Sequence, residues 1–527
     1  MTSNGWDVIV VGAGSAGAVL AARTAARGSR VLLLEAGPDY RSAQMKDVWR
    51  SPNPRLALLD PAASQELVWP DVNAARTDQQ EQELYWRGRG VGGSSAINGQ
   101  IAIRPPMADY EEWEALGCTG WSPTDVLPYF ARLEDDAQFG DAPHHGRGGP
   151  IPVHRMPQED WGGVDKALAR ACRAAGHPWT EDVNAPSGSG ISPYPINSRD
   201  GSRVTVNDGY LEWARDLDTL TVRGDSLVDR VLFEGDRAVG VRLVSGGEVA
   251  TAYADTVVLS AGVIHSPAIL MRSGIGPAAH LRDLAIDVRE DLPVGRGLQD
   301  HPLASVLLRL TDEASGKTPH DRHTNVCVRW TSGPGAPEND MMYVALNENV
   351  LAMGSATPGE RIGSYGVWLN RTYSRGVLTL TSTDPAKQPL VRERMLSDPR
   401  DPPRMRTGIR ELVRLARGPE TDRITIGSVE AANPELFAAL ASDSALDDYL
   451  LATVVDTQHG TSTCRMGAPD APETVVDGDC RVLGVDGLRV VDASVFPFVP
   501  RANTNLACIM AGELMADRLT GRGPIRT

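Results

Sequence analysis

The chain has 527 residues, more than one ordinary domain holds, so two or three hydrophobic cores are expected. Hydrophobic residues make up 41% and charged residues 23%, which is typical of a soluble globular protein. The formal net charge of −16 disfavours nucleic acid as a partner, because an acidic surface repels phosphate backbones. No apolar run approaches the roughly 20 residues that span a bilayer, so no membrane span is expected.

The N-terminus and the cysteines favour a cytoplasmic protein. "MTSNGWDVIVVGAG" enters a strand pattern almost at once and lacks the basic and apolar regions of a secretory signal. The six cysteines are too sparse for a disulfide framework, and no Cys/His cluster has the spacing of a zinc site. His144 and His145 lie in a Gly/Pro-rich loop and are not expected to bind metal.

The first 35 residues have the pattern of a dinucleotide-binding unit. "DVIVV", residues 7–11, predicts a buried parallel strand, since it is short, apolar and β-branched. "GAGSAG", residues 12–17, precedes the Ala-rich helical stretch "AVLAARTAARG". A second strand, "RVLLLE", ends at Glu35. The segment therefore contains all the parts of such a unit in order: a strand, a glycine-rich turn, a helix, a second strand and an acidic residue.

Each part of this unit has a physical task. Gly12 allows the tight turn, Gly14 lets the backbone approach a pyrophosphate, and Gly17 lets the helix pack on the strand. The helix N-terminus offers free N–H groups to the phosphates. Glu35 is suited to bind the ribose hydroxyls of the adenosine. The motif does not by itself choose between NAD and FAD, and a glycine-rich turn that binds nothing is the alternative.

Further motifs follow in a fixed order. They are "YWRGRGVGGSSAINGQI" (85–101), "SAGVIHSPAILMRSGIGP" (260–277), "GRGLQDHP" (295–302), "TQHGTSTCRMG" (457–467) and "LRVVDASVFPFVPRANTNLACIMAGELMADRL" (488–519). With these motifs the chain resembles the glucose–methanol–choline (GMC) family of flavoenzymes over nearly its whole length. "FGDAPHHGRGGPIPV" and "PRANTNL" look most similar to the bacterial hydroxymethylfurfural and aryl-alcohol oxidases. Gln458 departs from the large aromatic expected there, so a wider or more polar pocket mouth is expected.

The resemblance implies an α/β fold with a Rossmann-type FAD-binding domain and a second domain built on an antiparallel sheet. The FAD-binding domain is expected to be discontinuous, because its motifs lie at both ends and in the middle of the chain. We assign it residues 1–155, 195–300 and 455–527. Residues 156–194 and 301–454 are assigned to the substrate-binding domain.

The resemblance also implies FAD as the cofactor. Ile97 occupies the position at which some relatives attach FAD covalently through a histidine, and isoleucine has no nucleophile, so FAD is expected to be non-covalent. The residues matching cofactor-binding positions of the family are Gly12, Gly14, Ser15, Gly17, Glu35, Ala36, Arg89, Gly92, Gly93, Ser95, Asn98, Gly99, Val228, Asp492, Ala493 and Thr504. For Asp492 the alternative is a turn or helix cap.

The catalytic residues implied by the resemblance are His459 and Asn503. An alcohol gives hydride to flavin N5 only as its hydroxyl proton leaves, and a neutral imidazole is suited to take that proton as general base. The carboxamide of Asn503 can donate a hydrogen bond to the developing alkoxide; a helix N-cap is its alternative role, and one residue can fill both. The backbone N–H of Thr504, at the start of the following helix, is the expected donor to the reduced flavin. His301, in "QDHP", is expected to fix a loop near the flavin.

The function expected from these residues is FAD-dependent oxidation of a primary alcohol, with aryl and allylic alcohols as candidates. The partners are the small-molecule alcohol and O2 or another electron acceptor, and oxidase and dehydrogenase activity stay open. A hydroxynitrile lyase, which shares the fold and binds FAD without net redox chemistry, is the alternative. Residues 301–454 decide which alcohol binds, and their sequence does not reveal it.

Overall fold

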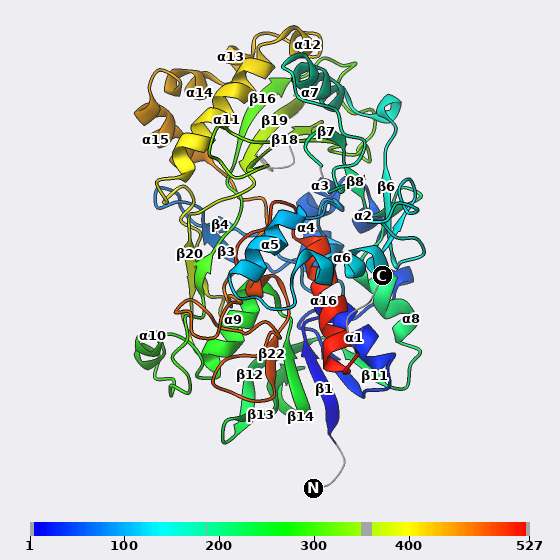
Figure 1. Ribbon diagram of the computed structural model, residues 1–527, viewed down its shortest axis with the longest axis vertical. Coiled ribbons are helices and arrows are strands. Elements are labelled where there is room, and N and C mark those ends of the chain that lie inside the picture. The colour runs from blue at the N-terminus through cyan, green and yellow to red at the C-terminus, as the bar shows by residue number, and fades with distance from the viewer. Residues whose placement is uncertain (1–4, 187, 349–360, 523–527) are drawn as a thin grey trace.

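The structure is a computed structural model that describes residues 5–186, 188–348 and 361–522. The molecule is elongated, with one sheet at each end of its long axis (Figure 1). The lower lobe contains the N-terminal strand and the glycine-rich turn that follows it, and the upper lobe contains an antiparallel sheet under a cover of helices. No described helix has both the length and the apolar character needed to cross a bilayer.

The lower sheet forms because its central strands are apolar and buried on both faces, as parallel strands in α/β proteins are. Strand β1 pairs in parallel with β2 on one side and with the end of β14 on the other, and β22 continues beyond β14. The strands are β11 (Leu220–Arg223), β2 (Val31–Leu34), β1 (Trp6–Val11), β14 (Glu248–Leu259), β13 (Arg237–Ser245), β12 (Ser226–Glu234) and β22 (Leu488–Val490).

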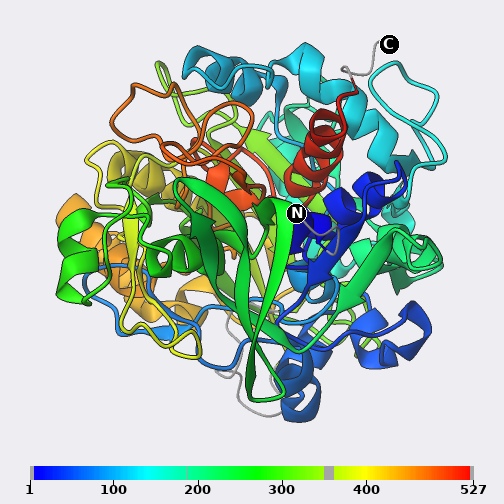
Figure 2. The same cartoon turned by 90° about the horizontal axis from the view of Figure 1, so that it is seen from below.

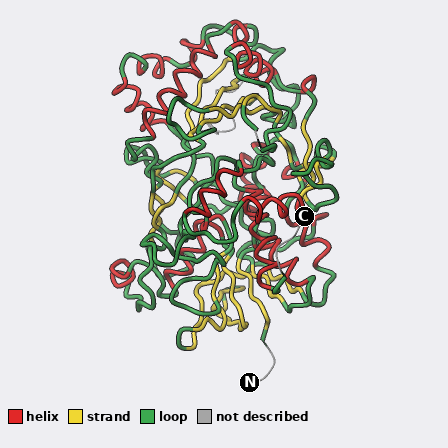
Figure 3. The backbone as a smooth tube through the Cα atoms, viewed as in Figure 1, coloured by secondary structure: helices red, strands yellow, loops and turns green. Residues whose placement is uncertain are grey.

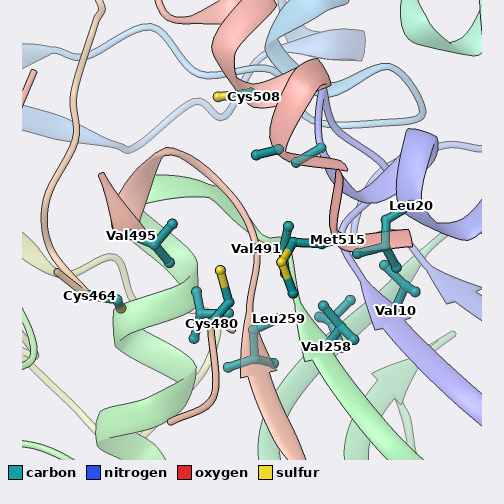
Figure 4. Close-up of a cluster of buried hydrophobic side chains, with 14 of the residues drawn as sticks. Val10, Leu20, Val258, Leu259, Cys464, Cys480, Val491, Val495, Cys508 and Met515 are labelled. Atoms are coloured by element: carbon teal, nitrogen blue, oxygen red, sulfur yellow. The ribbon is translucent and has the colours of Figure 1, made fainter. Parts of the chain in front are cut away.

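Helices from both ends of the chain cover this sheet. Helix α1 (Gly17–Ala25) packs against α16 (Asn505–Leu519), which lies beside the N-terminal elements when the molecule is seen from below (Figure 2). Helix α9 (Gly262–Arg272) follows β14 directly. Figure 4 shows the aliphatic core that results, in which side chains of β1 and β14 meet those of α1 and α16.

The upper sheet is antiparallel throughout, and its strands separate two apolar faces. On β18, Tyr343 and Ala345 belong to the core beneath the covering helices, whereas Met342 and Val344 belong to a second cluster on the opposite face. Its strands are β16 (Leu303–Arg309), β19 (Ile362–Leu369), β18 (Met341–Leu346), β17 (Val326–Trp330) and β7 (Gly190–Pro193). The helices beside it are α7 (Gly163–Ala174), α11 (Asp401–Ala416), α12 (Pro419–Asp422), α13 (Val429–Ala432), α14 (Pro434–Ala439) and α15 (Asp443–Thr453).

The remaining strands and helices are smaller. A mixed sheet contains β15 (Arg296–Leu298), β20 (Gly376–Thr379), β21 (Leu390–Arg392), β3 (Asn73–Ala75) and β4 (Glu83–Leu84). The other strands are β5 (Glu134–Asp136), β6 (Ile151–Arg155), β8 (Pro195–Ile196), β9 (Ser198–Arg199) and β10 (Ser202–Arg203). The remaining α-helices are α2 (Asp47–Arg50), α3 (Arg55–Leu59), α4 (Pro61–Leu67), α5 (Met107–Ala115), α6 (Pro123–Leu133), α8 (Glu212–Ala214) and α10 (Ala278–Asp283).

The expected fold class is confirmed: a Rossmann-type sheet with helices, parallel from β11 to β14 and extended by the antiparallel strands β13 and β12, is followed by a second, antiparallel sheet. The mixed sheet joins strands from both of the domains assigned from the sequence, because β20 and β21 pair with β15 and β3. The exact division between the two domains therefore stays a proposal.

Candidate active site

A cavity of about 410 Å³ lies between the two sheets. Its wall includes residues at the carboxyl ends of β1, β2 and β14, where open α/β sheets bind their ligands. The opposite wall comes from β16, β18 and β19. Figure 3 shows that both helices and loops lie between the two groups of strands, and loop residues are part of the cavity wall.

The glycine-rich turn after β1 packs as tightly as its sequence predicts. Gly12 has φ +99°, and a Cβ there would lie 2.4 Å from the carbonyl oxygen of Ser260. A Cβ on Gly17 would lie 2.1 Å from the carbonyl oxygen of Gly12, so only glycine lets α1 approach the strand this closely. A Cβ on Gly93 would lie 2.7 Å from the Cα of Gly14. The two glycine-rich loops thus pass each other backbone to backbone at the cavity wall.

Glu35 holds these loops together with its carboxylate. Oε2 accepts a hydrogen bond from the backbone N–H of Ala13 at 2.8 Å, and Oε1 accepts from Gly37 at 2.9 Å and Gly90 at 3.0 Å. Burial raises the pKa of Glu35, against the opposing effect of these three hydrogen bonds. Glu35 also lines the cavity, so ribose binding, its role expected from the sequence, is compatible with its position.

Most of the residues expected to bind the cofactor line this cavity. They are Gly12, Gly14, Ser15, Glu35, Ala36, Gly93, Asn98, Gly99, Val228, Asp492, Ala493 and Thr504. Four others are not part of the wall: Gly17, Arg89, Gly92 and Ser95. These four support the loops instead. For example, Arg89 donates to the carbonyl oxygen of Ala36 at 3.1 Å, and the Ser95 hydroxyl donates to the carbonyl oxygen of Gly92 at 2.7 Å.

Asp492 caps two elements at the cavity wall. Its Oδ1 accepts from the backbone N–H of Ser494 at 2.8 Å, which caps a short 3₁₀ turn. Its Oδ2 accepts from the N–H of Gly262 at 2.9 Å and from the hydroxyl of Ser266 at 2.6 Å, at the start of α9. The capping role considered as an alternative is therefore present, in a residue that also lines the cavity.

His459 and Asn503 meet at the cavity wall. Asn503 Nδ2 lies 2.9 Å from Nε2 of His459, and the other amide atom, Oδ1, has no partner among the described residues. Helix α16 begins at Asn505 without a side-chain cap, so the N-cap role considered for Asn503 is wrong. The side chain of Asn503 does not cap the helix because it bonds to His459. Burial holds the pKa of His459 well below its usual range, and His301 and Arg87 lower it further, so the imidazole is neutral.

Three residues near His459 were not assigned to catalysis from the sequence. His301 Nδ1 lies 3.0 Å from His459 Nδ1, in contact with the catalytic candidate itself. The hydroxyl of Thr457 lies 2.7 Å from the same nitrogen, and it also bonds to the buried carboxylate of Asp300. The "QDHP" motif is the signal that could have located His301 and Asp300, and the motif "TQHGTSTCRMG" itself begins at Thr457, two residues before His459.

The rest of the chamber beside His459 is largely apolar. Trp368 lies with its ring centroid 6.1 Å from that of His459, and Leu303, Val344 and Leu346 also line the wall. Gln458 brings a polar group: its Oε1 accepts from Arg87 at 3.1 Å and its amide nitrogen donates to Asp456. The wider or more polar pocket mouth expected from Gln458 stays a prediction.

The cavity suits the FAD that the resemblance implies. It extends from the glycine-rich turn, which offers side-chain-free backbone to a pyrophosphate, to the pair of His459 and Asn503. Ser15 at the turn donates to Asn505 at the start of α16 at 2.8 Å, so the two helix N-termini face the same space. Ile97, where some flavoenzymes carry the attaching histidine, lines the cavity too.

Comparisons with known proteins agree with this geometry. The sequence models of the GMC oxidoreductase family match residues 6–303 and 372–512. A 5-(hydroxymethyl)furfural oxidase from Methylovorus sp. (strain MP688) is 36% identical, in an alignment that covers 98% of this chain and 99% of that protein. An oxygen-dependent choline dehydrogenase from Photobacterium profundum is 33% identical, with 99% and 94% covered.

A solved structure of similar shape extends the comparison. The crystal structure of pyridoxine 4-oxidase from Mesorbium loti superposes with a TM-score of 0.88 and 27% identity, covering 97% of this chain and 99% of that one. The resemblance inferred from the motifs is confirmed. With both family models matched and a relative 36% identical over almost the full length, the chain belongs to the GMC oxidoreductase family and is an FAD-dependent oxidoreductase.

Proposed function

We propose that this protein oxidises a primary alcohol to the aldehyde, with His459 as general base and Asn503 as the group that binds the substrate oxygen. The observation that carries the proposal is the 2.9 Å contact between Asn503 Nδ2 and His459 Nε2 at the wall of a cavity that begins at the glycine-rich turn. A base and a hydrogen-bond donor so close together can act on one alcohol oxygen.

The two side chains have separate tasks. When bound, FAD supplies the acceptor for the hydride that leaves the alcohol carbon. His459, kept neutral by burial, takes the hydroxyl proton on a ring nitrogen, so that the carbonyl can form. The amide of Asn503 donates to the substrate oxygen while negative charge develops on it, and its own state does not change with pH.

The cofactor contacts follow from the wall of the cavity. We assign the ADP half to the turn with Gly12, Gly14 and Ser15 and to Glu35, and the flavin half to the loop that ends in Asn98 and Gly99. The attachment is non-covalent, because Ile97 offers no nucleophile. Acid precipitation should therefore release all the flavin into the supernatant, and flavin that stays with the protein pellet would contradict this.

The substrate class proposed is an aryl or allylic primary alcohol. Trp368 and the aliphatic side chains of Leu303, Val344 and Leu346 suit a flat apolar substituent next to the reacting carbon. The compound named for one relative, 5-(hydroxymethyl)furfural, carries such a hydroxymethyl group on an aromatic ring. Among the charged side chains of the described wall, Arg87 and Asp456 both bond to Gln458, and Nε and Nη2 of Arg87 have no hydrogen-bond partner there.

Anaerobic mixing of the purified holoprotein with a panel of primary alcohols tests the proposal. An aryl or allylic alcohol should bleach the flavin band, and admission of air then separates an oxidase, which recolours fast, from a dehydrogenase that needs another acceptor. If dithionite bleaches the flavin but no alcohol does, the redox proposal fails. Cleavage of a cyanohydrin by that protein would then support the lyase alternative.

A further inference from the structure

On the side of His459 that faces away from Asn503, a chain of hydrogen bonds leads to a buried carboxylate. Thr457 Oγ1 lies 2.7 Å from His459 Nδ1, and the same hydroxyl lies 3.2 Å from Oδ1 of Asp300. Asp300 is buried and also accepts from its neighbour, the backbone N–H of His301, at 2.7 Å and from the hydroxyl of Tyr85 at 2.7 Å. One hydroxyl thus connects the imidazole with a fixed acceptor.

The chemistry of these groups decides where their hydrogens lie. An ionised carboxylate can only accept, so the Thr457 hydroxyl donates to Asp300. The oxygen of Thr457 then presents its lone pair to His459 Nδ1, which must carry a hydrogen to complete the chain. His301 is neutral, because burial lowers its pKa to about 3, and its Nδ1 at 3.0 Å can accept from the same group.

We propose that Thr457 and Asp300 form a hydroxyl–carboxylate relay that holds His459 as the tautomer with its hydrogen on Nδ1. This leaves the lone pair on Nε2, the nitrogen that faces Asn503 and the cavity. The inference rests on the proposed function and deepens it, because it names Nε2 as the base. Thr457 and Asp300 are positioning residues that act through His459.

The relay also has a task after proton transfer. The alcohol proton moves to Nε2, the C–H hydrogen leaves the carbon with its electron pair for the bound FAD, and the aldehyde remains. His459 is then an imidazolium whose Nδ1–H is held by Thr457. The negative charge of Asp300, one hydroxyl away, stabilises that cation without itself taking the proton.

The relay has a defined pH range, because it requires an ionised Asp300. Burial raises the pKa of Asp300 to about 6, and the charge of Asp456 raises it too, while Arg87 and the hydrogen bond from Tyr85 act in the opposite direction. Below this pKa the protonated carboxyl can donate to Thr457, which reverses the chain and puts the hydrogen on Nε2. The ionisable groups around Asp300 and His459 are Tyr85, Arg87, Arg76, His301, Glu393 and Asp456.

The test compares variants of Thr457 by the rate of flavin reduction. The holoenzymes are mixed anaerobically with the alcohol found in the panel, at saturating concentration, between pH 5 and 9. Thr457→Val removes the hydroxyl and keeps the shape, Thr457→Ser restores the hydroxyl, and Thr407→Val on the exposed side of α11 is the matched control. If the valine variant binds FAD poorly, the Thr457→Ala variant is measured in its place.

The valine variant should reduce its flavin about 10-fold to 100-fold more slowly at pH 8, the size of the loss expected for a hydrogen bond to a charged group. In the unchanged enzyme the rate of flavin reduction should fall as the pH drops below about 6, because Asp300 becomes protonated. The valine variant should not show this fall. Thr457→Ser should restore both the rate at pH 8 and the dependence on pH. If Thr457→Val keeps the normal rate and pH profile while His459→Ala is inactive, the relay is wrong and the base assignment stands. A fully active His459→Ala overturns the proposed function together with the relay.

Discussion

At the scale of single residues, His459 combines three properties that a general base needs. It is neutral, because burial keeps its pKa low. It is oriented, because polar groups contact both ring nitrogens. It is reachable, because it lines the cavity. A structural histidine would satisfy the first two conditions, so the third gives the catalytic proposal its strength.

Replacement of His459 by alanine should reduce turnover of the alcohol by roughly 10²- to 10⁴-fold, the usual contribution of a general base. The protein should still bind FAD, because the glycine-rich turn and Glu35 lie at the other end of the cavity wall. His154→Ala is the matched control, since this half-buried histidine bonds to Ser198 and does not line the cavity. Steady-state turnover and the flavin content of both variants check the expectation, and near-normal turnover without His459 would refute it.

At the scale of elements, the path from β1 through the glycine-rich turn to α1 depends on the absence of side chains. Gly12 and Gly17 approach backbone so closely that a Cβ at either position would lie within 2.4 Å of a carbonyl oxygen. The helix can then direct its N-terminal N–H groups at the cavity. At α9, the carboxylate of Asp492 accepts hydrogen bonds from the first turn of the helix.

A Gly17→Ala variant should therefore lose stability and cofactor together. Its methyl group would meet Gly12 O at 2.1 Å and Ser260 Cβ at 2.7 Å, and overpacking of this kind costs about 1–3 kcal/mol. Gly333→Ala is the control, because a Cβ there has no atom within 4 Å and the backbone does not have positive φ. Chemical denaturation and the FAD content of the purified proteins provide the measurement. Equal behaviour of the two variants would show that α1 can shift at no cost.

Some elements of this protein were predictable from the sequence and others were not, for physical reasons. The turn at Gly12 and the strands beside it were predictable because their pattern is local: an apolar run, glycines and an acid at fixed spacing. The bond from Thr457 to Asp300 was not predictable, because these two residues lie 157 positions apart in the chain, whereas His459 is only two residues from Thr457. The capping alternative for Asn503 failed for the same reason, since only the fold brings His459 to its amide.

At the scale of the whole molecule, a buried ionic cluster joins segments from both proposed domains. We define it as Arg104, Glu134, Asp136, His145, Arg155 and Asp182. His145 is central: its Nδ1 lies 2.7 Å from Glu134 and its Nε2 lies 2.8 Å from Asp182. With His145 protonated, three positive side chains balance three carboxylates. The two guanidinium groups already bind these carboxylates, which favours an ionic cluster over a metal site.

The pH dependence of stability follows from the pKa of His145. Burial alone would lower this pKa, but the hydrogen bonds to Asp182 and Glu134 outweigh burial and raise it. A raised pKa in the folded state means that the charged imidazole adds stability below its unfolded pKa of about 6.5. That contribution disappears as the pH rises through the folded pKa. The cluster should therefore be strongest in mildly acidic solution.

Replacement of His145 by glutamine should lower the free energy of unfolding by about 3–5 kcal/mol at pH 6, because it leaves three buried carboxylates facing two guanidinium groups. At pH 9 the loss should be smaller, since the unchanged protein has then lost the same positive charge. His144→Gln is the matched control: burial lowers the pKa of His144, its side chain is 24% exposed, and its removal should cost less than about 0.5 kcal/mol. Urea unfolding of the three holoproteins at both pH values measures the differences. A penalty for His145→Gln that does not change with pH would mean that His145 is neutral in the folded protein and that the two domains are joined by the arginines alone.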